Sequence, residues 1–310
     1  MSIVVVTGSD GFVGRSLTAM LSTAGHRVIP VAREHAVLGD RHLISSSLES
    51  AMRDSHAVIH LAGRAHVIDE LHNDPLGEFR KVNLNGTLSI AEMAASVGVA
   101  RFVFVSSIGV LGNTSGGRMF NEDDEPSPKG PYAVSKWQAE QGLHSVAKNS
   151  GLQIVVVRPP LVYGPHVKGN FLRLLRLVAS GIPLPFSAIQ NCRSYVGVHN
   201  LCDFLISCAF HPAANGRTFN IADGEDVSTP ELLQIIATAM GKRARIFRCP
   251  LSILHATAVV LGKKAELERL TTNLRVDSSF ARATLGWQPT QALRVGIAEM
   301  VHWFMREPRS

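Results

Sequence analysis

A glycine-rich turn close to the N-terminus constrains the fold of this chain more than any other sequence feature. The β-branched run at 3–7 leads directly into glycines at positions 8, 11 and 14, and an amphipathic segment follows. Between a strand and a helix, Gly8 permits the tight turn, Gly11 lets the backbone approach a pyrophosphate, and Gly14 allows close helix–strand packing. The helix N-terminus attracts negative charge. The turn predicts dinucleotide binding through Gly8, Gly11, Phe12, Val13 and Gly14.

The first half of the chain repeats this alternation of short apolar runs and longer amphipathic segments. The runs are apolar almost throughout, which is typical of parallel strands that helices cover on both faces. We expect strands at 3–7, 27–31, 57–62, 101–106 and 153–158, and helices that include 12–24 and 82–97. The sequence therefore predicts an α/β fold with a Rossmann-type doubly wound parallel sheet.

Prolines interrupt the chain from Pro159 onward and indicate a change of organisation. A strand and helix at 195–210 and a strand at 218–221 are expected to return to the main sheet. Residues 1–164 and about 195–221 are thus predicted to form the dinucleotide-binding domain. Residues from about 165 to 194 and from 222 to 310 are predicted to form a smaller, discontinuous C-terminal substrate-binding lobe.

Hydropathy and cysteine spacing favour a cytoplasmic protein without a membrane partner. The longest apolar stretch, 251–261, is well short of the roughly 20 residues that cross a bilayer, and we expect a buried helix there. The N-terminus lacks the basic lead and the cleavage site of a secretory signal. The four cysteines follow neither zinc-ligand nor Cys-x-x-Cys spacing, which favours reduced thiols.

The formal net charge of +6 does not indicate nucleic-acid binding. Lysines and arginines are scattered, with no basic helix and no interleaved aromatic residues. A small polyanionic ligand explains the charge better. The 13 histidines include His56, His60, His66 and His72, but they form no His-x-x-x-His helix pair and no supporting carboxylate pattern. We therefore predict no metal.

The end of the second expected strand bears on the choice of dinucleotide. An acidic residue at this tip binds the ribose 2′-hydroxyl of NAD and repels the 2′-phosphate of NADP. The chain reads Val31-Ala32-Arg33, without a carboxylate, and Arg33 can pair with a phosphate. NADP(H) is therefore the favoured cofactor, and NAD(H) is the alternative. For Arg33 itself, the alternative is a solvated surface residue without a role in binding.

A tyrosine and a lysine stand four residues apart, on one face of a helix that Pro131 is suited to begin. The ammonium of Lys136 is expected to lower the pKa of Tyr132 from its free value of about 10. Tyr132 can then act as a general acid or base. Ser106 and Ser107 end the strand expected upstream, at the sheet edge where ligands bind. A serine there can hydrogen-bond a substrate oxygen, and the alternative for either serine alone is a cap of the strand end.

Together with four further segments, these motifs resemble the extended short-chain dehydrogenase/reductase family, also called the nucleotide-sugar epimerase/dehydratase family. The four segments are His60-Leu61-Ala62-Gly63, Asn83-Leu84-Asn85-Gly86-Thr87, Arg158-Pro159-Pro160 and Val162-Tyr163-Gly164-Pro165. The resemblance covers nearly the whole chain. The ordered set is far more specific than any one motif.

The resemblance implies a role for each of these residues. Ser107, Tyr132 and Lys136 would be the catalytic residues, with the serine and tyrosine at the substrate and the tyrosine and lysine also at the cofactor. Asn83 would support the helix that carries the tyrosine. The remaining residues expected beside the cofactor are Leu61, Ala62, Gly63, Asn83 and Pro159. The family often forms homodimers through the helix that carries the tyrosine and its neighbour, so a homodimer is expected. The intact catalytic set argues against a non-catalytic redox sensor or scaffold.

The two residues after the catalytic serine narrow the range of reactions. Family dehydratases carry an Asp-Glu pair there, whereas this chain has Ile108 and Gly109, so chemistry at one carbon is expected. The full sequence resembles bacterial enzymes of surface-polysaccharide and O-antigen synthesis. These reduce UDP-4-keto-6-deoxy-N-acetylhexosamines to UDP-N-acetylquinovosamine or UDP-N-acetylfucosamine. NADPH-dependent 4-keto reduction is therefore the favoured function, and the alternative is a UDP-sugar 4-epimerase with tightly bound NAD+.

The expected substrate is a UDP-activated sugar. Arg193 precedes a strand and resembles the family arginine that reaches the nucleotide phosphates, although a surface arginine is the alternative. Asn170 matches a nucleotide contact more loosely, and Arg275 would reach the nucleotide from the far lobe. Leu161 replaces an asparagine of many relatives and Leu111 replaces a frequent tyrosine, so the identity of the sugar stays open.

Overall fold

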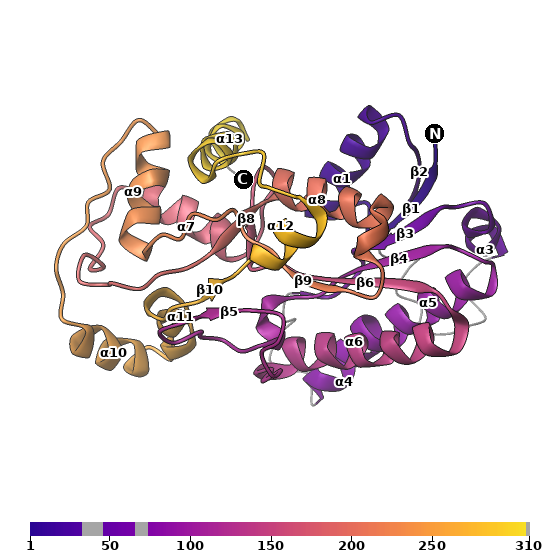
Figure 1. Ribbon diagram of the computed structural model, residues 1–310. Helices are drawn as coiled ribbons and strands as arrows, with labels where there is room; N and C mark the ends of the chain where they lie inside the picture. The colour runs from indigo at the N-terminus through magenta and orange to yellow at the C-terminus, as the bar shows by residue number, and fades with distance from the viewer. Residues whose placement is uncertain (33–45, 66–73, 308–310) are drawn as a thin grey trace.

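A six-stranded parallel sheet, in the order β2-β1-β3-β4-β6-β9, forms one end of the molecule, and a smaller lobe forms the other end (Figure 1). The computed structural model describes residues 1–32, 46–65 and 74–307. The strands are β1 (Ile3–Thr7), β2 (Arg27–Val31), β3 (Ala57–His60), β4 (Arg101–Val105), β6 (Gln153–Arg158) and β9 (Thr218–Asn220). The predicted α/β fold with a Rossmann-type parallel sheet is confirmed, although three expected strands end slightly earlier.

Helices cover both faces of this sheet, as the apolar strands predict. On one face lie α1 (Phe12–Thr23), α8 (Val198–Phe210) and α12 (Ser279–Leu285), and on the other α3 (Ser46–Arg53), α5 (Thr87–Ser96) and α6 (Gly130–Ser150) (Figure 1). Val4 and Val6 belong to the first of these cores and Val5 belongs to the second, because successive side chains of a strand point to opposite faces. Burial on both faces explains why β1 carries no charged residue.

The sheet has a switch point beside the glycine turn. β1 pairs with β2 on one side and with β3 on the other, and the chain visits these two neighbours in succession. In open α/β sheets, ligands bind at such a point, outside the carboxyl ends of the strands. The loops that follow β1 and β3 are therefore the first place to look for a ligand site.

The smaller lobe contains two short parallel strand pairs. β7 (Leu161–Tyr163) pairs with β8 (Tyr195–Gly197), and β5 (Met119–Phe120) pairs with β10 (Arg275–Val276). The helices of this half are α7 (Asn170–Ala179), α9 (Thr229–Ala239), α10 (Leu251–Val260), α11 (Lys264–Thr271) and α13 (Leu293–Arg306). A core that includes Tyr163, Phe171 and Leu233 joins β7 and β8 to α7, α9 and α13.

One expected strand does not return to the main sheet. β8 pairs with β7, so the prediction for the strand at 195 is wrong, whereas α8 packs against the main sheet and β9 joins it beside β6. Pro159 and Pro160 lack the N–H groups that would continue the β6 ladder. The chain therefore leaves the main sheet before β7, and β8 pairs with β7 outside that sheet.

The helix expected at 82–97 is not uniform. α4 (Pro75–Arg80) leads into a π-helical turn at Lys81–Gly86, and α5 follows. Single π-helical turns inside helices occur frequently at functional sites. This one carries Asn83.

The apolar stretch at 251–261 forms α10, but its predicted burial is wrong. Leu254 and Ala258 are buried against Leu267 of α11, whereas Ile253 and Val260 are 56% and 85% exposed. The α10–α11 pair lies at the end of the smaller lobe, and α10 packs mainly against α11 (Figure 1). Within 1–32, 46–65 and 74–307, no helix is long and apolar enough to span a membrane.

Candidate active site

Two glycines of the N-terminal turn occupy positions where no side chain fits. Gly8 has a φ of +69°, and a Cβ atom there would lie 2.8 Å from the Ala62 nitrogen. A Cβ atom on Gly14 would lie 2.2 Å from the Gly8 carbonyl oxygen. Only glycine combines this backbone conformation with such close contacts. The tight turn and the close packing of α1 are those expected from the sequence.

The N-terminus of α1 fits the diphosphate of a dinucleotide. Gly11 is the N-cap, no side chain caps the first turn, and that turn holds no acidic residue. Its backbone N–H groups and the helix dipole can therefore act on an anion. Phe12 and Val13 begin the helix and pack against the sheet core. Arg33, on which the choice of NADP depends, lies outside the described residues.

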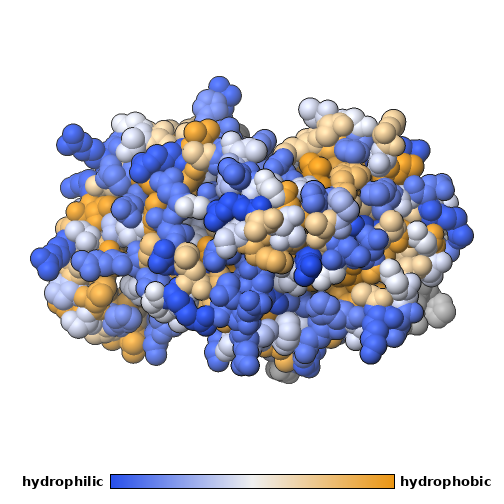
Figure 2. Space-filling model, in the orientation of Figure 1, coloured by the Kyte–Doolittle hydropathy of each residue, from blue (hydrophilic) through white to orange (hydrophobic). Residues whose placement is uncertain are grey.

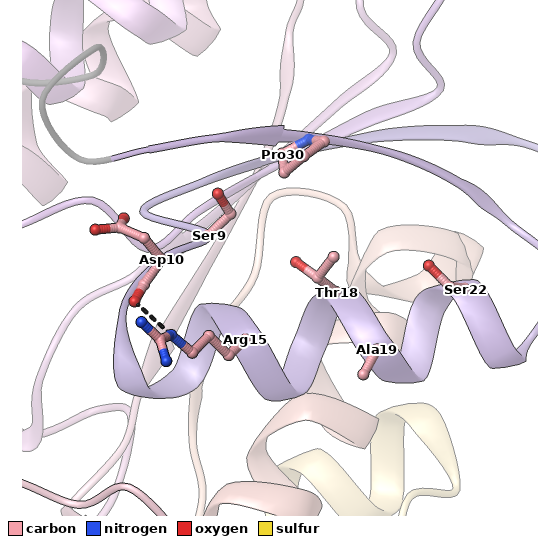
Figure 3. A pocket seen from close by; sticks show the side chains of 7 residues that line it. All are labelled: Ser9, Asp10, Arg15, Thr18, Ala19, Ser22 and Pro30. Carbon is pink, nitrogen blue, oxygen red and sulfur yellow. Dashed lines mark hydrogen bonds between the residues drawn. The ribbon is translucent and has the colours of Figure 1, made fainter.

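A surface pocket of about 390 Å³ lies beside this turn, between α1 and β2 (Figure 3). It is lined by Ser9, Asp10, Arg15, Thr18, Ala19, Ser22 and Pro30. Arg15 Nε donates a hydrogen bond of 3.0 Å to the Asp10 carbonyl, which ties α1 to the glycine turn. Ser107, Tyr132 and Lys136 do not line this pocket, so it is distinct from the predicted catalytic residues.

The loop after β3 joins the glycine turn to the catalytic residues. Leu61 packs against the main core, and the Ala62 nitrogen faces Gly8. A Cβ atom on Gly63 would lie 3.5 Å from Lys136 Nζ. The three residues expected beside the cofactor therefore lie between its predicted diphosphate site and Lys136.

A buried histidine at the end of β3 connects three elements, which the sequence did not reveal. His60 Nδ1 lies 2.8 Å from Thr7 Oγ1, and His60 Nε2 lies 3.1 Å from Thr87 Oγ1. Complete burial lowers the pKa of His60 to about 3, and Lys136 acts in the same direction. The ring is therefore neutral at physiological pH, and it links β1 and β3 to α5.

Asn83 ties the loop after β3 to the start of α6. Its Oδ1 accepts a hydrogen bond of 2.8 Å from the Arg64 nitrogen, and its Nδ2 donates to the Arg64 carbonyl and to Ser135 Oγ at 3.1 and 3.0 Å. Ser135 Oγ donates in turn to the Tyr132 carbonyl at 2.7 Å. Asn83 thus lies where the resemblance implied, against the helical turn that carries Tyr132.

Ser107, Tyr132 and Lys136 come together where β4 ends and α6 begins. Pro131 lies in the first turn of α6, as predicted. The Ser107 hydroxyl hydrogen-bonds Tyr132, one turn before Lys136. Lys136 Nζ donates a hydrogen bond of 2.7 Å to the Val105 carbonyl, two residues before the serine. Strand end and helix start therefore hold the three side chains in one cluster.

The ionisation of this cluster differs from the prediction. Burial raises the pKa of Tyr132 to about 12, and the hydrogen bond with Ser107 acts against that rise. Burial also lowers the pKa of Lys136 to about 7, opposed by Glu140. The expected lowering of the tyrosine pKa by Lys136 is wrong here, because burial of the phenol dominates. Lys136 itself is bound to the backbone of β4 and lies 4.4 Å from the centre of the Phe104 ring. Burial therefore favours the protonated phenol.

A buried ion pair lies beside the cluster, and the sequence did not reveal it. Arg158 at the end of β6 donates to Glu140 of α6 through Nη2 at 2.6 Å and through Nε at 3.1 and 3.2 Å. Ser106 also hydrogen-bonds Glu140. The Glu140 side chain is fully buried, one helical turn beyond Lys136, and it favours the charged form of that lysine. The pair fastens α6 to the strands that end at the site.

Pro159 lies beside the residue that follows the predicted catalytic serine. Its carbonyl accepts a hydrogen bond of 3.0 Å from the nitrogen of Ile108, which follows Ser107. Leu111 is buried in a small apolar cluster with Ile108, whereas Leu161 is 40% exposed. The two leucines that depart from the family pattern therefore lie in different environments.

Arg193 is half-buried in the smaller lobe. Its Nη1 donates a hydrogen bond of 3.0 Å to the Thr272 carbonyl, and its side chain also hydrogen-bonds Tyr195. Burial lowers the pKa of the guanidinium from its ordinary value. Its backbone forms a bridge to Leu274, next to Arg275. These contacts hold the guanidinium against the 272–275 segment, while its role at a nucleotide stays a prediction.

The other two predicted substrate residues have different surroundings. Arg275 Nε forms an ion pair with Asp226 at 2.9 Å, and its side chain is 36% exposed. Asn170 is the exposed first residue of α7. The structure places the two arginines on neighbouring segments, while Asn170 belongs to a separate element.

Residues 4–222 match the NAD dependent epimerase/dehydratase family. The chain belongs to this family. Its relatives include a UDP-glucose 4-epimerase of Vibrio cholerae, which is 39% identical over 313 residues covering 98% of this chain and 95% of the relative. A GDP-6-deoxy-D-mannose reductase of Pseudomonas aeruginosa is 28% identical over 306 residues, covering 94% of this chain and 93% of the relative.

The fold of this epimerase/dehydratase chain is also that of solved structures. A crystal structure of UDP-glucose 4-epimerase with UDP-glucose, from Thermotoga maritima, superposes with a TM-score of 0.76 at 22% identity and covers 98% of this chain and 99% of that one. Family membership makes the chain an NAD(P)-dependent enzyme of the extended short-chain dehydrogenase type that modifies a nucleotide sugar.

Proposed function

We propose that this enzyme interconverts a UDP-linked hexose and its C4 epimer, and that it retains tightly bound NAD+ between turnovers. The observation that carries the proposal is the 39% identity to the Vibrio cholerae UDP-glucose 4-epimerase over 98% of the chain. This identity supports the 4-epimerase that the sequence left as an alternative over the 4-reductase that it favoured. Ile108 and Gly109, in place of the dehydratase acids, support chemistry at a single carbon.

In this proposal the proton chemistry belongs to the cluster at the end of β4. As its phenolate, Tyr132 takes the proton of the C4 hydroxyl during oxidation, and it returns that proton during reduction. Ser107, hydrogen-bonded to Tyr132, binds the same oxygen and holds it beside the phenol. When bound, the nicotinamide supplies the acceptor and donor of the C4 hydrogen. Lys136 holds the nicotinamide ribose.

Inversion at C4 sets a further requirement. The keto sugar must present its other face before reduction, while its nucleotide stays bound. Arg193 is suited to hold the diphosphate during this turn, because its guanidinium is already fixed by Thr272 and loses little freedom on binding. Arg275 and Asn170 are further proposed contacts of the nucleotide.

The proposed cofactor site consists of the glycine turn, the first turn of α1 and the loop after β3. Gly8, Gly11 and Gly14 bring the backbone close to the diphosphate, with Phe12 and Val13 supplying N–H groups. The loop at Leu61–Gly63, Asn83 and Pro159 border the nicotinamide half.

A second candidate function is the NADPH-dependent reduction of a UDP-4-keto-6-deoxy-N-acetylhexosamine. It is favoured by the end of β2, where Val31-Ala32-Arg33 lacks the carboxylate that would repel a 2′-phosphate. The product would be UDP-N-acetylquinovosamine or UDP-N-acetylfucosamine for surface polysaccharide or O-antigen. The same catalytic residues would serve, with Tyr132 donating a proton to the C4 oxygen.

The state of the cofactor distinguishes the two candidates. Purified enzyme is denatured to release its dinucleotide, and native enzyme is incubated with UDP-glucose or UDP-N-acetylglucosamine without added cofactor. We expect stoichiometric NAD+ and formation of the C4 epimer. If the enzyme instead carries no dinucleotide, forms no epimer and oxidises NADPH in step with reduction of a UDP-4-keto sugar, the second candidate is correct.

A further inference from the structure

Exposed apolar side chains gather around α10, at the far end of the smaller lobe. The α10 patch consists of Phe247, Leu251, Ile253, Val259, Val260 and Leu261, which are 49%, 41%, 56%, 60%, 85% and 64% exposed. Apolar surface is visible at this end of the molecule (Figure 2), where Figure 1 places α10. Contiguous apolar surface of this kind marks an interaction site more often than scattered apolar residues do.

Only a narrow side of α10 is buried against the rest of the described protein. Leu254 and Ala258 are buried, and they pack with Leu267 of α11, beside Phe186 and Cys249. The remaining apolar residues of α10 project from the rest of its circumference. The patch therefore lies on the outward side of a helix at the end of the molecule (Figure 1). An exposed apolar helix of this kind can insert into a deformable apolar layer, such as the acyl boundary of a membrane.

Basic residues flank the α10 patch on both sides along the chain. The exposed cations are Lys242, Arg243, Arg245, Arg248, Lys263 and Lys264. No aspartate or glutamate occurs between Glu231 and Glu266. Lys264 forms an exposed ion pair with Glu268, at 3.8 Å. An exposed apolar helix that cations flank along the chain is complementary to a surface that is apolar inside and anionic outside.

We propose that the α10 patch docks on the surface of an anionic lipid membrane. α10 has 10 residues and is about 15 Å long, too short to span a bilayer, so its contact is interfacial. The side chains of the patch enter the acyl boundary, and the flanking arginines and lysines bind the headgroups. This proposal revises the expectation that the protein has no membrane partner. It does not depend on the proposed 4-epimerase reaction.

Vesicle co-sedimentation of the full chain tests this docking. We expect the protein to bind vesicles of phosphatidylglycerol and phosphatidylcholine, to bind pure phosphatidylcholine vesicles much more weakly, and to be released by raised salt. The double variant Val259→Ser/Val260→Ser should lose at least about tenfold in partitioning. Val295→Ser, at a 52% exposed valine of α13, is the matched control and should bind like the parent.

Three results would overturn the proposal: no binding to either vesicle, equal binding to both, or an equal loss from Val295→Ser. A concentration-dependent dimer that Val259→Ser/Val260→Ser abolishes, without vesicle binding, would also overturn it in favour of an interface between copies. Turnover of a UDP-sugar in solution should be the same in the double variant and the parent. Loss of membrane binding is thereby distinguished from failure of the proposed reaction.

Discussion

At the scale of single residues, the chemistry of the site depends on how completely its groups are buried. Tyr132 and Lys136 lie one helical turn apart, yet burial raises the pKa of one to about 12 and lowers that of the other to about 7. Both shifts favour the uncharged forms, as desolvation does in general. For Tyr132 to accept a proton, its phenolate must be stabilised by further positive charge at the site. A bound oxidised dinucleotide would supply that charge on its nicotinamide.

Replacing Tyr132 by phenylalanine tests the proposed proton transfer. We expect turnover to fall by about 10²- to 10⁴-fold, because general acid–base catalysis is lost, while the amount of bound dinucleotide stays the same. Turnover is measured by product formation and dinucleotide by release on denaturation. Tyr163→Phe is the matched control: Tyr163 donates to Asp223 at 2.6 Å within the core, so this variant should lose stability and keep its turnover. Unchanged turnover in Tyr132→Phe would remove the tyrosine from the mechanism.

His60 should give stability a pH dependence that reports its burial. Its pKa is about 3 in the fold and about 6.5 when exposed, so between these values the unfolded chain binds a proton that the folded chain does not. The free energy of unfolding therefore decreases as the pH is lowered through about 6.5. From this group alone the decrease is roughly 2 kcal/mol between pH 7 and pH 5. His60→Gln should remove this part of the slope in urea titrations.

The exposed His144 provides the control for this titration. His144→Gln should keep the pH dependence of the parent. If His60→Gln also keeps it, then His60 is not held neutral in the fold.

At the scale of elements, the site is assembled by contacts that connect distant parts of the sequence. The β1–turn–α1 unit and the Tyr132–Lys136 helix could be predicted because their signals are local: a glycine spacing, a proline at a helix start and an apolar run. His60 could not be assigned in this way, because its partners Thr7 and Thr87 are 53 and 27 residues away. The exposure of α10 was also missed, because an apolar run does not reveal how many neighbours its helix will have.

The Arg158–Glu140 pair should make a large contribution to the attachment of α6. Removing one partner leaves the other charge buried, so Arg158→Met should lower the free energy of unfolding by about 3–5 kcal/mol. Adding Glu140→Gln should recover part of this loss, since the unpaired charge is removed while the amide can still accept from Ser106. Urea titrations of the parent, the two single variants and the double variant give the coupling free energy between Arg158 and Glu140.

An exposed pair serves as the reference for this cycle. Arg53 and Glu49 lie 3.0 Å apart with side chains 62% and 45% exposed, so Arg53→Met should change stability by less than about 1 kcal/mol. A loss in Arg158→Met no larger than that in Arg53→Met would show that the buried pair does not fasten α6.

At the scale of the whole molecule, the two ends of the protein are joined more closely than the predicted domains suggest. Ala281, Leu285 and Trp287, within the segment assigned to the smaller lobe, pack in the main-sheet core. The division into 1–164 with about 195–221, and about 165–194 with 222–310, remains our proposal for the cofactor and substrate halves. Homodimerisation through the helix that carries Tyr132 also stays a prediction.

The central claim is that the enzyme oxidises and reduces the same C4 atom with a cofactor it does not release. Incubation with UDP-glucose that carries deuterium at C4, without added dinucleotide, tests this most directly, with the product analysed by mass spectrometry and NMR. The proposal predicts UDP-galactose that retains the deuterium at C4, because the hydrogen returns from the same bound cofactor. Absence of UDP-galactose, with turnover seen only when NADPH and a UDP-4-keto sugar are supplied, would contradict it.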